Sequence, residues 1–337
     1  MEKRPDPIRF LAAWTALPLL AACAGPGTAS LPSAGVTRSV AAGKEPGKGV
    51  IYQGCPVFGH GGAYNGVVTK AAIDPNSAQY ISSVIQAGDT MGFYASTGVE
   101  QVNLANDQTP LLTVQPKVKY HQFPVAYPWQ SYFYIEPLGD AHAIVVQTQK
   151  CHLFEAYGTS YAYPTLSAYC GANWSLRDHF VPLPPGTPSG MASGLPLMAG
   201  MVRWEDYQAG SIDHALNWDG IANTVSQYSF VRPASDTDWL PFGGSSSYQI
   251  PYGAHLRLKA SFSTSGWGPQ ATMVANAMKT YGVYLADTGS GGNAIYFANA
   301  SDGTNPWSSS DLSALSQITM SDFDVLKLKN VEQVPGH

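Results

Sequence analysis

After residue 50 the chain alternates between short apolar runs and clusters of Gly, Pro, Asn and Asp, a pattern typical of β-strands joined by turns. Five segments are predicted as strands on this basis: residues 111–114, 117–123, 211–218, 228–233 and 255–262. We therefore expect a mainly β fold with a few short helices, in a β-sandwich or jelly-roll-like arrangement, with an α+β fold as the alternative.

The clearest pair of strands spans residues 141–147 and 151–157, with a tight turn at residues 149–150 between them. In the first strand, His142 shares its face with two aliphatic side chains. In the second strand, Glu155 has apolar neighbours two residues away on either side. The pattern predicts a β-hairpin that carries one histidine and one glutamate within otherwise apolar faces.

Three stretches have helical rather than alternating spacing of their apolar residues. Short helices are predicted within residues 74–85 and 196–207. A third helix is predicted to begin at Pro269, which suits a first helical position, and to end at Gly282, which suits a left-handed cap. A buried strand over residues 283–286 is expected to follow it.

Residues 1–22 are predicted to be a signal peptide that directs lipidation. Basic residues precede an apolar core over residues 10–22, which is too short to span a bilayer and ends in the lipobox pattern Leu20-Ala-Ala-Cys23. Cys23 would then begin the mature chain and carry palmitate or other acyl chains, and residues 23–49, rich in Gly, Ala, Ser and Pro, would form a flexible tether. An ordinary secretory signal cut near Ala22 is the alternative.

Residues 50–337 are expected to form a single large β-rich domain. Loss of the signal peptide removes three of 18 basic and two of 23 acidic side chains, and the resulting net charge of −6 argues against nucleic acid as a partner. No further long apolar run follows, so contact with a membrane is expected through the lipid anchor only. Because Ala24 rather than aspartate follows Cys23, the expected destination is the outer membrane, on its periplasmic or surface face.

Three cysteines remain after Cys23. In an oxidising envelope a disulfide between Cys151 and Cys170 is the expected pair, because it would join a strand to the loop that follows, and Cys55 would be left over. The other pairings stay open from the sequence. The chain contains no Cys-x-x-Cys motif, zinc-type Cys/His spacing, Walker loop or dinucleotide fingerprint, so neither a metal nor a cofactor is expected.

Four side chains are candidates for catalysis. Glu155, at an inward-facing strand position, is the candidate general acid, because burial would raise its pKa. Asp140 or Asp287 is the candidate second carboxylate, since glycoside hydrolysis needs two carboxyl groups in one cleft, and His142 is a candidate from the same hairpin. The structural alternatives are a buried ion pair for Glu155 and a turn-forming role for Asp287.

Five further side chains are candidates for binding a substrate. His214 lies between apolar neighbours, where a core histidine with satisfied hydrogen bonds is the alternative. Arg257 and Lys259 leave one predicted strand on the same side, from which they could bind an anionic sugar or pair with the candidate acid. Trp174 and Trp267 offer flat apolar faces on which sugar rings could stack, with packing in a β-rich core as the alternative.

Several motifs in residues 70–290 resemble those of an uncharacterised family of secreted bacterial proteins. The main matching stretches are Gly139-Asp-Ala-His-Ala-Ile-Val-Val, Cys151-His-Leu-Phe-Glu-Ala-Tyr, Gly194-Leu-Pro-Leu-Met-Ala-Gly-Met-Val-Arg, Gly253-Ala-His-Leu-Arg-Leu-Lys-Ala-Ser-Phe and Met278-Lys-Thr-Tyr-Gly-Val-Tyr-Leu-Ala-Asp-Thr-Gly-Ser. Similar proteins often carry carbohydrate-binding appendages, so the resemblance implies an extracellular polysaccharide context and assigns no catalytic residue. It also implies an acidic residue before Gly194, where this chain has Gly190-Met191.

Together these features predict a lipoprotein anchored to the cell envelope that acts on an extracellular or cell-wall polysaccharide. Hydrolysis of a glycosidic bond by paired carboxylates is the favoured activity, because the candidate carboxylates are expected on one hairpin and on the end of a buried strand. A carbohydrate-binding lipoprotein without catalysis and a structural envelope protein are the two alternatives.

Overall fold

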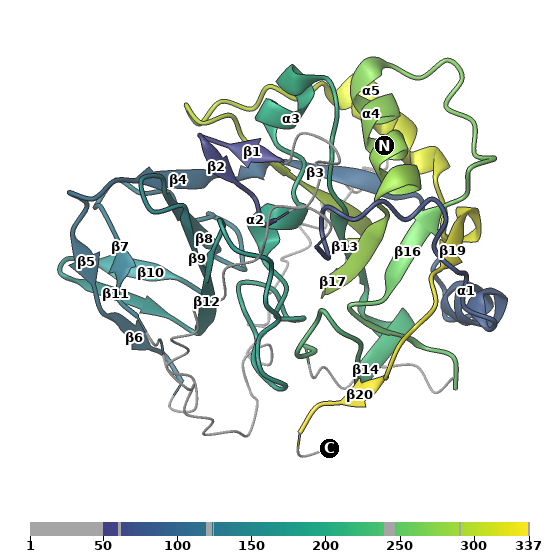
Figure 1. The fold of residues 1–337 in the computed structure, drawn as a ribbon, viewed down its shortest axis with the longest axis horizontal. Coiled ribbons are helices and arrows are strands. Elements are labelled where there is room, and N and C mark those ends of the chain that lie inside the picture. Colours follow the sequence, from purple (N-terminus) through teal and green to yellow (C-terminus); the bar gives the residue numbers. More distant parts are fainter. Residues whose placement is uncertain are drawn as a thin grey trace, which may run out of the picture.

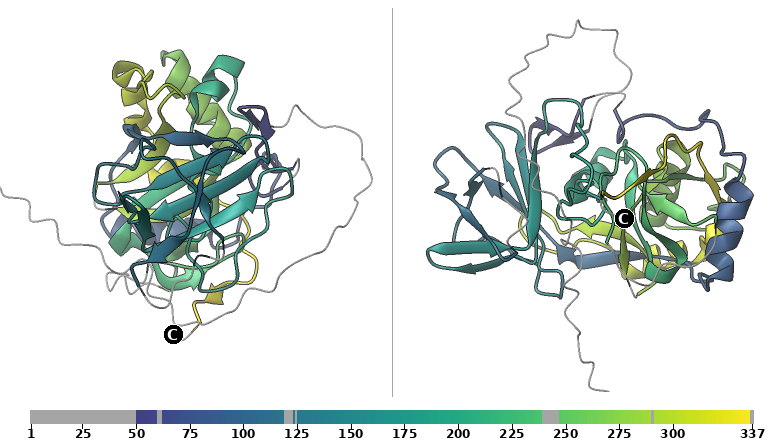
Figure 2. Two further views of the ribbon diagram at one scale, coloured as in Figure 1. Left: turned by 90° about the vertical axis from the view of Figure 1, so that its left-hand side faces the viewer. Right: turned by 90° about the horizontal axis from the view of Figure 1, so that it is seen from below.

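The computed structural model describes residues 50–59, 62–118, 123, 125–238, 247–289 and 291–335. The predicted signal peptide, the lipidation site Cys23 and the predicted tether lie outside the described residues. Within them, every helix is too short or too polar to cross a membrane. Figure 1 shows one group of sheets on the left of the molecule and a larger mixed sheet with most of the helices on the right, and Figure 2 shows this arrangement from the side and from below.

The larger sheet has six strands and mixes parallel with antiparallel neighbours. In spatial order its strands are β19 (Phe323–Val325), β16 (His255–Leu258), β17 (Val283–Gly289), β13 (Leu216–Ile221), β18 (Asn293–Ala298) and β3 (Phe93–Glu100). β13 runs parallel to β17, and β18 runs parallel to β3. The two central strands therefore end on the same edge of the sheet.

A four-stranded sheet carries the predicted hairpin. In spatial order its strands are β12 (Cys170–Ser175), β9 (His152–Tyr157), β8 (Ala143–Gln147) and β4 (Val102–Ala105). Four small sheets complete the described strands: β10 (Ser160–Ala162) with β11 (Thr165–Ala168) and β6 (Val114–Pro116); β15 (Ile250–Tyr252) with β14 (Val225–Phe230) and β20 (Glu332–Gln333); β1 (Ile51–Tyr52) with β2 (Cys55–Pro56); and β5 (Leu111–Leu112) with β7 (Tyr127–Pro128).

The helices are short. They are α1 (Ser77–Gln86), α2 (Leu197–Gly200), α3 (Trp204–Ala209), α4 (Pro269–Thr280) and α5 (Ser309–Leu312), with 3-10 turns η1 (Ala222–Thr224), η2 (Ser313–Gln317) and η3 (Met320–Asp322). The predicted first and third helices are confirmed as α1 and α4. α4 has Pro269 in its first turn, and Gly282, with φ +80°, follows its end, as their local signals predict.

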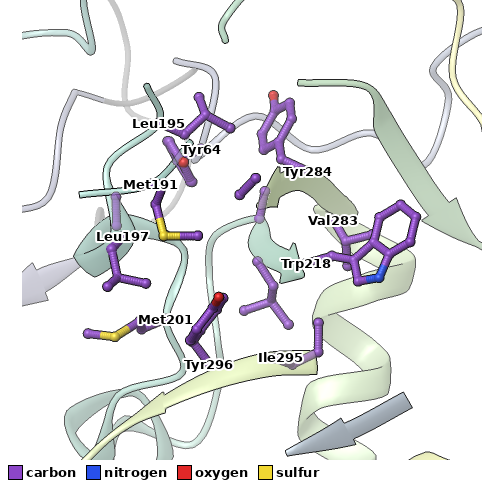
Figure 3. Packing of buried hydrophobic residues seen from close by; sticks show 14 of the residues in the cluster. Tyr64, Met191, Leu195, Leu197, Met201, Trp218, Val283, Tyr284, Ile295 and Tyr296 are labelled. Atoms are coloured by element: carbon purple, nitrogen blue, oxygen red, sulfur yellow. The ribbon is translucent and has the colours of Figure 1, made fainter. Parts of the chain in front are cut away.

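Two hydrophobic cores lie on the two faces of the hairpin β8–β9. Ile144 and Leu153 point into the main core, whereas Val145 and Phe154 point into a smaller core with β6, β7 and β11. Figure 3 shows the main core around Trp218, where β13, β17 and β18 meet the segment that includes α2. Both faces of this hairpin are therefore buried, and its strands hold the two parts of the molecule together.

The predicted fold class is confirmed: the structure is mainly β, with a few short helices. Its sheets have the α+β arrangement given above as the alternative. A jelly roll pairs its strands antiparallel, whereas here β4 also runs parallel to β8.

Some element boundaries differ from the predicted ones. The single helix expected over residues 196–207 is divided into α2 and α3, because Met201 is extended (φ −78°, ψ 148°) and Val202 forms a parallel bridge with Phe297. Residues 117–118 form a bend rather than a strand, and the rest of that predicted strand is largely outside the described residues.

The predicted disulfide between Cys151 and Cys170 is wrong. Cys151 is bonded to Cys55, 96 positions earlier in the chain. The register of β9 with β12 explains the difference, because Cys170 lies opposite Tyr157 at one end of β9, whereas Cys151 precedes the other end. The bond therefore fastens the N-terminal β1–β2 hairpin to the turn between β8 and β9.

Candidate functional site

A cavity of about 180 Å³ lies between the four-stranded sheet and the edge of the six-stranded sheet at which β13 and β17 end. Its titratable lining residues are four aspartates, one histidine and two tyrosines: Asp140, Asp219, Asp238, Asp287, His142, Tyr157 and Tyr296. Lysine and arginine are absent from the described lining. The cavity thus brings together three of the four predicted catalytic side chains, namely Asp140, His142 and Asp287.

Asp219 and Asp287 are partners on adjacent parallel strands. β13 and β17 pair in register up to Trp218, a bulge follows, and Asp219 then lies opposite Asp287. Bulges commonly redirect side chains beside functional sites. Both aspartates are half-buried and line the cavity.

The carboxylate of Asp287 is held by main-chain donors. Its Oδ2 accepts the N–H of Ala192 and its Oδ1 accepts the N–H of Thr288, both at 2.8 Å. Burial raises the pKa of Asp287 to about 7; the two N–H groups act against the rise, and the nearby charges of Asp238 and Asp140 add to it. Asp287 therefore accepts hydrogen bonds from the nearby main chain, as in the turn-forming alternative, and it also lines the cavity.

Asp219 has a different environment. Within the described part of the chain, its Oδ1 is buried and has no hydrogen-bond partner. Burial, followed by the charges of Asp287 and Asp140, raises the pKa of Asp219 well above its ordinary range, against the lowering effects of a hydrogen bond with Tyr296 and the charge of His142. An ionised carboxylate would leave a charged oxygen unsatisfied, so the neutral acid is the favoured form.

The opposite wall is formed by residues at the start of β8 and the end of β9. Asp140 is exposed at the rim, and the rings of His142 and Tyr157 are 5.9 Å apart. Nδ1 of His142 lies 3.0 Å from Oε1 of Glu100 and 3.7 Å from Oε2 of Glu136. Burial lowers the pKa of His142, but the two glutamates and Asp140 outweigh it and bring the value to about 10.

Glu100, Glu136 and His142 also form the one set of described residues whose ligand atoms are close enough to hold a metal, within 4.8 Å of one another. Hydrogen bonds already account for their positions. Nδ1 of His142 is used by Glu100, and both oxygens of Glu136 accept main-chain N–H groups, from Leu138 at 3.0 Å and from His142 at 3.2 Å. We therefore interpret the cluster as a hydrogen-bonded network of carboxylates and imidazole.

Glu155, the predicted general acid, is not among the residues that line the cavity. The residue is only 1% exposed, and its two carboxylate oxygens accept the N–H groups of Leu197 and Met198, each at 2.8 Å, at the start of α2. Burial raises the pKa of Glu155 to about 7 as expected, while these N–H groups lower it. The geometry gives Glu155 the role of holding α2 in place, so the catalytic interpretation of this residue is corrected.

The predicted polar substrate ligands lie away from the cavity. His214 is fully buried between Asp206 (3.2 Å from Nε2) and the carbonyl oxygen of Ala215 (2.8 Å from Nδ1), which is the core alternative. Arg257 donates to the carbonyl oxygens of residues 68 and 69 and pairs with an aspartate of β19, and Lys259 donates to the carbonyl oxygen of residue 321. These contacts give all three side chains structural roles.

The two predicted aromatic ligands also lie elsewhere. Trp174 is buried in the main core, with its ring 6.2 Å from that of Phe180. Trp267 is half-buried beside Phe262, at the start of α4, and its Nε1 is 3.4 Å from Oε1 of Gln317. Neither indole lines the cavity, so packing explains both better than stacking on a sugar does.

The sequence prediction missed Asp219, Asp238 and Tyr296. The only local signal for Asp219 was its position directly after the predicted strand over residues 211–218. Gly190 and Met191 also line the cavity.

No protein-family model matches this chain, and no curated protein and no solved structure is significantly similar to it.

Proposed function

We propose that the protein hydrolyses a glycosidic bond in an extracellular or cell-wall polysaccharide, with Asp219 and Asp287 as the catalytic pair. The observation that carries the proposal is the partner position of these two aspartates on parallel strands beside one cavity. Adjacent strands lie about 4.8 Å apart. This strand spacing is close to the roughly 5–5.5 Å that separates the two carboxyl groups of retaining glycosidases.

The surroundings of the two aspartates give them different roles. Asp219, as the neutral acid, donates its proton to the glycosidic oxygen while the bond from that oxygen to the anomeric carbon breaks. Asp287, whose ionised form is favoured by two main-chain N–H groups, attacks the anomeric carbon and forms a glycosyl ester. Asp219, now ionised, takes a proton from water as the water oxygen attacks the anomeric carbon, and the ester bond breaks to release Asp287.

Other lining residues would bind the sugar. Asp140 at the rim and Asp238 on the opposite side offer carboxylate oxygens to sugar hydroxyl groups, and Tyr157 offers an aromatic wall. A lining with four aspartates and no described basic side chain other than His142 disfavours acidic sugars, because their carboxylates would be repelled. The substrate we propose is therefore a neutral or amine-bearing glycan.

We also propose that Cys23 anchors the protein to the envelope, which would bring the cavity to polymers in the periplasm or at the cell surface. The lipobox pattern supports this part of the proposal. Growth with labelled palmitate tests it: the wild-type chain should be labelled and the Cys23→Ser chain should not. Labelling of both chains, or of neither, would contradict the anchor.

Incubation of the Cys23→Ser chain with a panel of neutral, amine-bearing and acidic polysaccharides tests the activity, with reducing ends as the readout. Release of reducing ends from a neutral or amine-bearing glycan is expected. Retardation in an affinity gel without hydrolysis would show a binding protein in place of an enzyme. Absence of both would leave the structural alternative and would contradict the proposal.

A further inference from the structure

His142 is held from outside the cavity by two glutamates that the proposed reaction does not use. Glu100 ends β3 of the six-stranded sheet, and Glu136 lies in the loop before β8. The side chains of Glu100, Glu136 and His142 are 4%, 3% and 5% exposed, respectively. His142, which precedes β8 of the four-stranded sheet, is thus hydrogen-bonded to Glu100 of the six-stranded sheet beside the cavity.

A hydrogen bond with Glu100 occupies one of the two ring nitrogens of His142. Nδ1 of His142 is 3.0 Å from Glu100, so Nε2 is the ring nitrogen left for the cavity that His142 lines. Glu136 also fixes the main chain of His142, since the N–H of His142 donates to the Glu136 carboxylate and the N–H of Glu136 donates to the carbonyl oxygen of His142 at 2.9 Å. Such carboxylate partners orient a histidine and set which of its nitrogens carries a proton.

The charged groups around the ring are almost all acidic. Glu100, Glu136 and Asp140 act on His142, and His142 in turn acts on Asp219 and Glu155. Each of these carboxylates favours a cationic ring when it is ionised, and no described lysine or arginine lines this wall to oppose them.

We propose that Glu100 is a positioning residue that holds His142 as an imidazolium, with its Nε2–H presented to the cavity as a fixed hydrogen-bond donor. The inference that a glycan hydroxyl group accepts this hydrogen bond rests on the proposed function. The inference that His142 is protonated and oriented does not. A fixed cation at this point also limits the repulsion among the aspartates of the cavity.

Side-chain ¹H–¹⁵N NMR of the Cys23→Ser chain tests the proposal, with His142→Gln identifying the resonance among the eight histidines. At pH 8, His142 should be protonated on both ring nitrogens. Glu100→Gln should lower the titration midpoint of His142 by more than one pH unit, Glu100→Asp should restore part of the shift, and the control Glu205→Gln should leave it unchanged.

A neutral His142 in the wild-type sequence at pH 8, a midpoint unchanged by Glu100→Gln, or an Nδ1 bound to a metal ion would each overturn the proposal. The wild-type spectrum alone decides the first and third outcomes, so the test survives if Glu100→Gln does not fold. Because the NMR readout needs no glycan, its failure is distinct from a failure of hydrolysis. Hydrolysis with a neutral His142 would overturn this inference only, and a protonated His142 without hydrolysis would overturn only the proposed function.

Discussion

Asp219 and Asp287 lie opposite one another on parallel strands, but only Asp287 is stabilised as an anion by the main chain. Its two oxygens each accept an N–H at 2.8 Å, whereas Oδ1 of Asp219 is buried and unpartnered among the described residues. This asymmetry favours the ionised form of Asp287 over the ionised form of Asp219. Two groups of this kind with separated pKa values are what acid and nucleophile roles require.

The first prediction concerns the pH dependence of hydrolysis. Because burial raises the pKa of Asp287 to about 7, kcat/KM should rise with pH as Asp287 ionises, with a midpoint near 7, and should fall again at higher pH, when the raised pKa of Asp219 is passed. Asp238→Asn should move the acidic limb to lower pH, since the charge of Asp238 raises the pKa of Asp287. An acidic limb near pH 4 in the wild type would contradict this assignment.

The second prediction separates Glu155 from the catalytic pair. Glu155→Gln should lower the free energy of unfolding by about 1–3 kcal/mol, because an amide offers one acceptor to the two N–H groups of α2. The pKa of Glu155 is about 7 in the folded state against an ordinary 4.5, so its protonation stabilises the protein fully below about pH 4.5, and this stability is lost as pH rises through 7.

Urea unfolding at pH 4.5 and pH 8 measures this contribution. The difference between the wild type and Glu155→Gln should be larger at pH 4.5 than at pH 8. The folded variant should keep its activity. Loss of hydrolysis in a variant that is fully folded under the assay conditions would return Glu155 to the catalytic set.

The third prediction concerns the buried cluster around Asp206. Its carboxylate pairs with Arg203 at 3.1 Å and with His214 at 3.2 Å, and both partners are fully buried. Asp206→Asn should cost about 3–5 kcal/mol, because it leaves the guanidinium of Arg203 buried without its countercharge. The neighbouring Glu205→Gln should change stability by no more than about 0.5 kcal/mol.

The pH dependence of the wild type gives a second check on Asp206. Although burial raises it, the charges of Arg203 and His214 lower the pKa of Asp206 to about 2. The stability that this group contributes is present above about pH 4 and is lost as pH falls towards 2. We expect the free energy of unfolding of Asp206→Asn to lack this loss at acid pH. The same loss in the variant as in the wild type would contradict the assignment.

The fourth prediction concerns the disulfide. A bond that closes a loop of about 100 residues contributes roughly 4–5 kcal/mol in the chain-entropy account, so the double variant Cys55→Ala/Cys151→Ala should lose stability of that order. Mass spectrometry of unreduced peptides should find Cys55 linked to Cys151. A peptide that links Cys151 to Cys170 would show the pairing expected from the sequence instead.

Local signals predicted much of the fold. The hairpin β8–β9 follows from alternation within a few residues, and α4 follows from Pro269 at its start and Gly282 after its end. The division between α2 and α3 was missed because it depends on a bridge from Val202 to Phe297, far along the chain. Alternation along one segment carries no information about such a partner.

The site was predicted in part for the same reason. Asp140 and His142 were found because they lie at the start of a strand-like run, and Asp287 because it lies at the end of one; all three line one cavity. Asp219 was missed because its importance comes from a parallel register and a bulge that only the assembled sheet defines. Glu155 was correctly expected to be buried, but the sequence does not show that the main chain of α2 occupies its oxygens.

The most direct test of the central claim is the release of reducing ends from the polysaccharide that the wild-type protein cleaves, measured for Asp219→Asn, Asp287→Asn and the exposed control Asp302→Asn. The account predicts losses of about 10²–10⁴-fold for the first two variants and an unchanged rate for the control. A folded Asp219→Asn or Asp287→Asn protein that hydrolyses the glycan at the wild-type rate would contradict it.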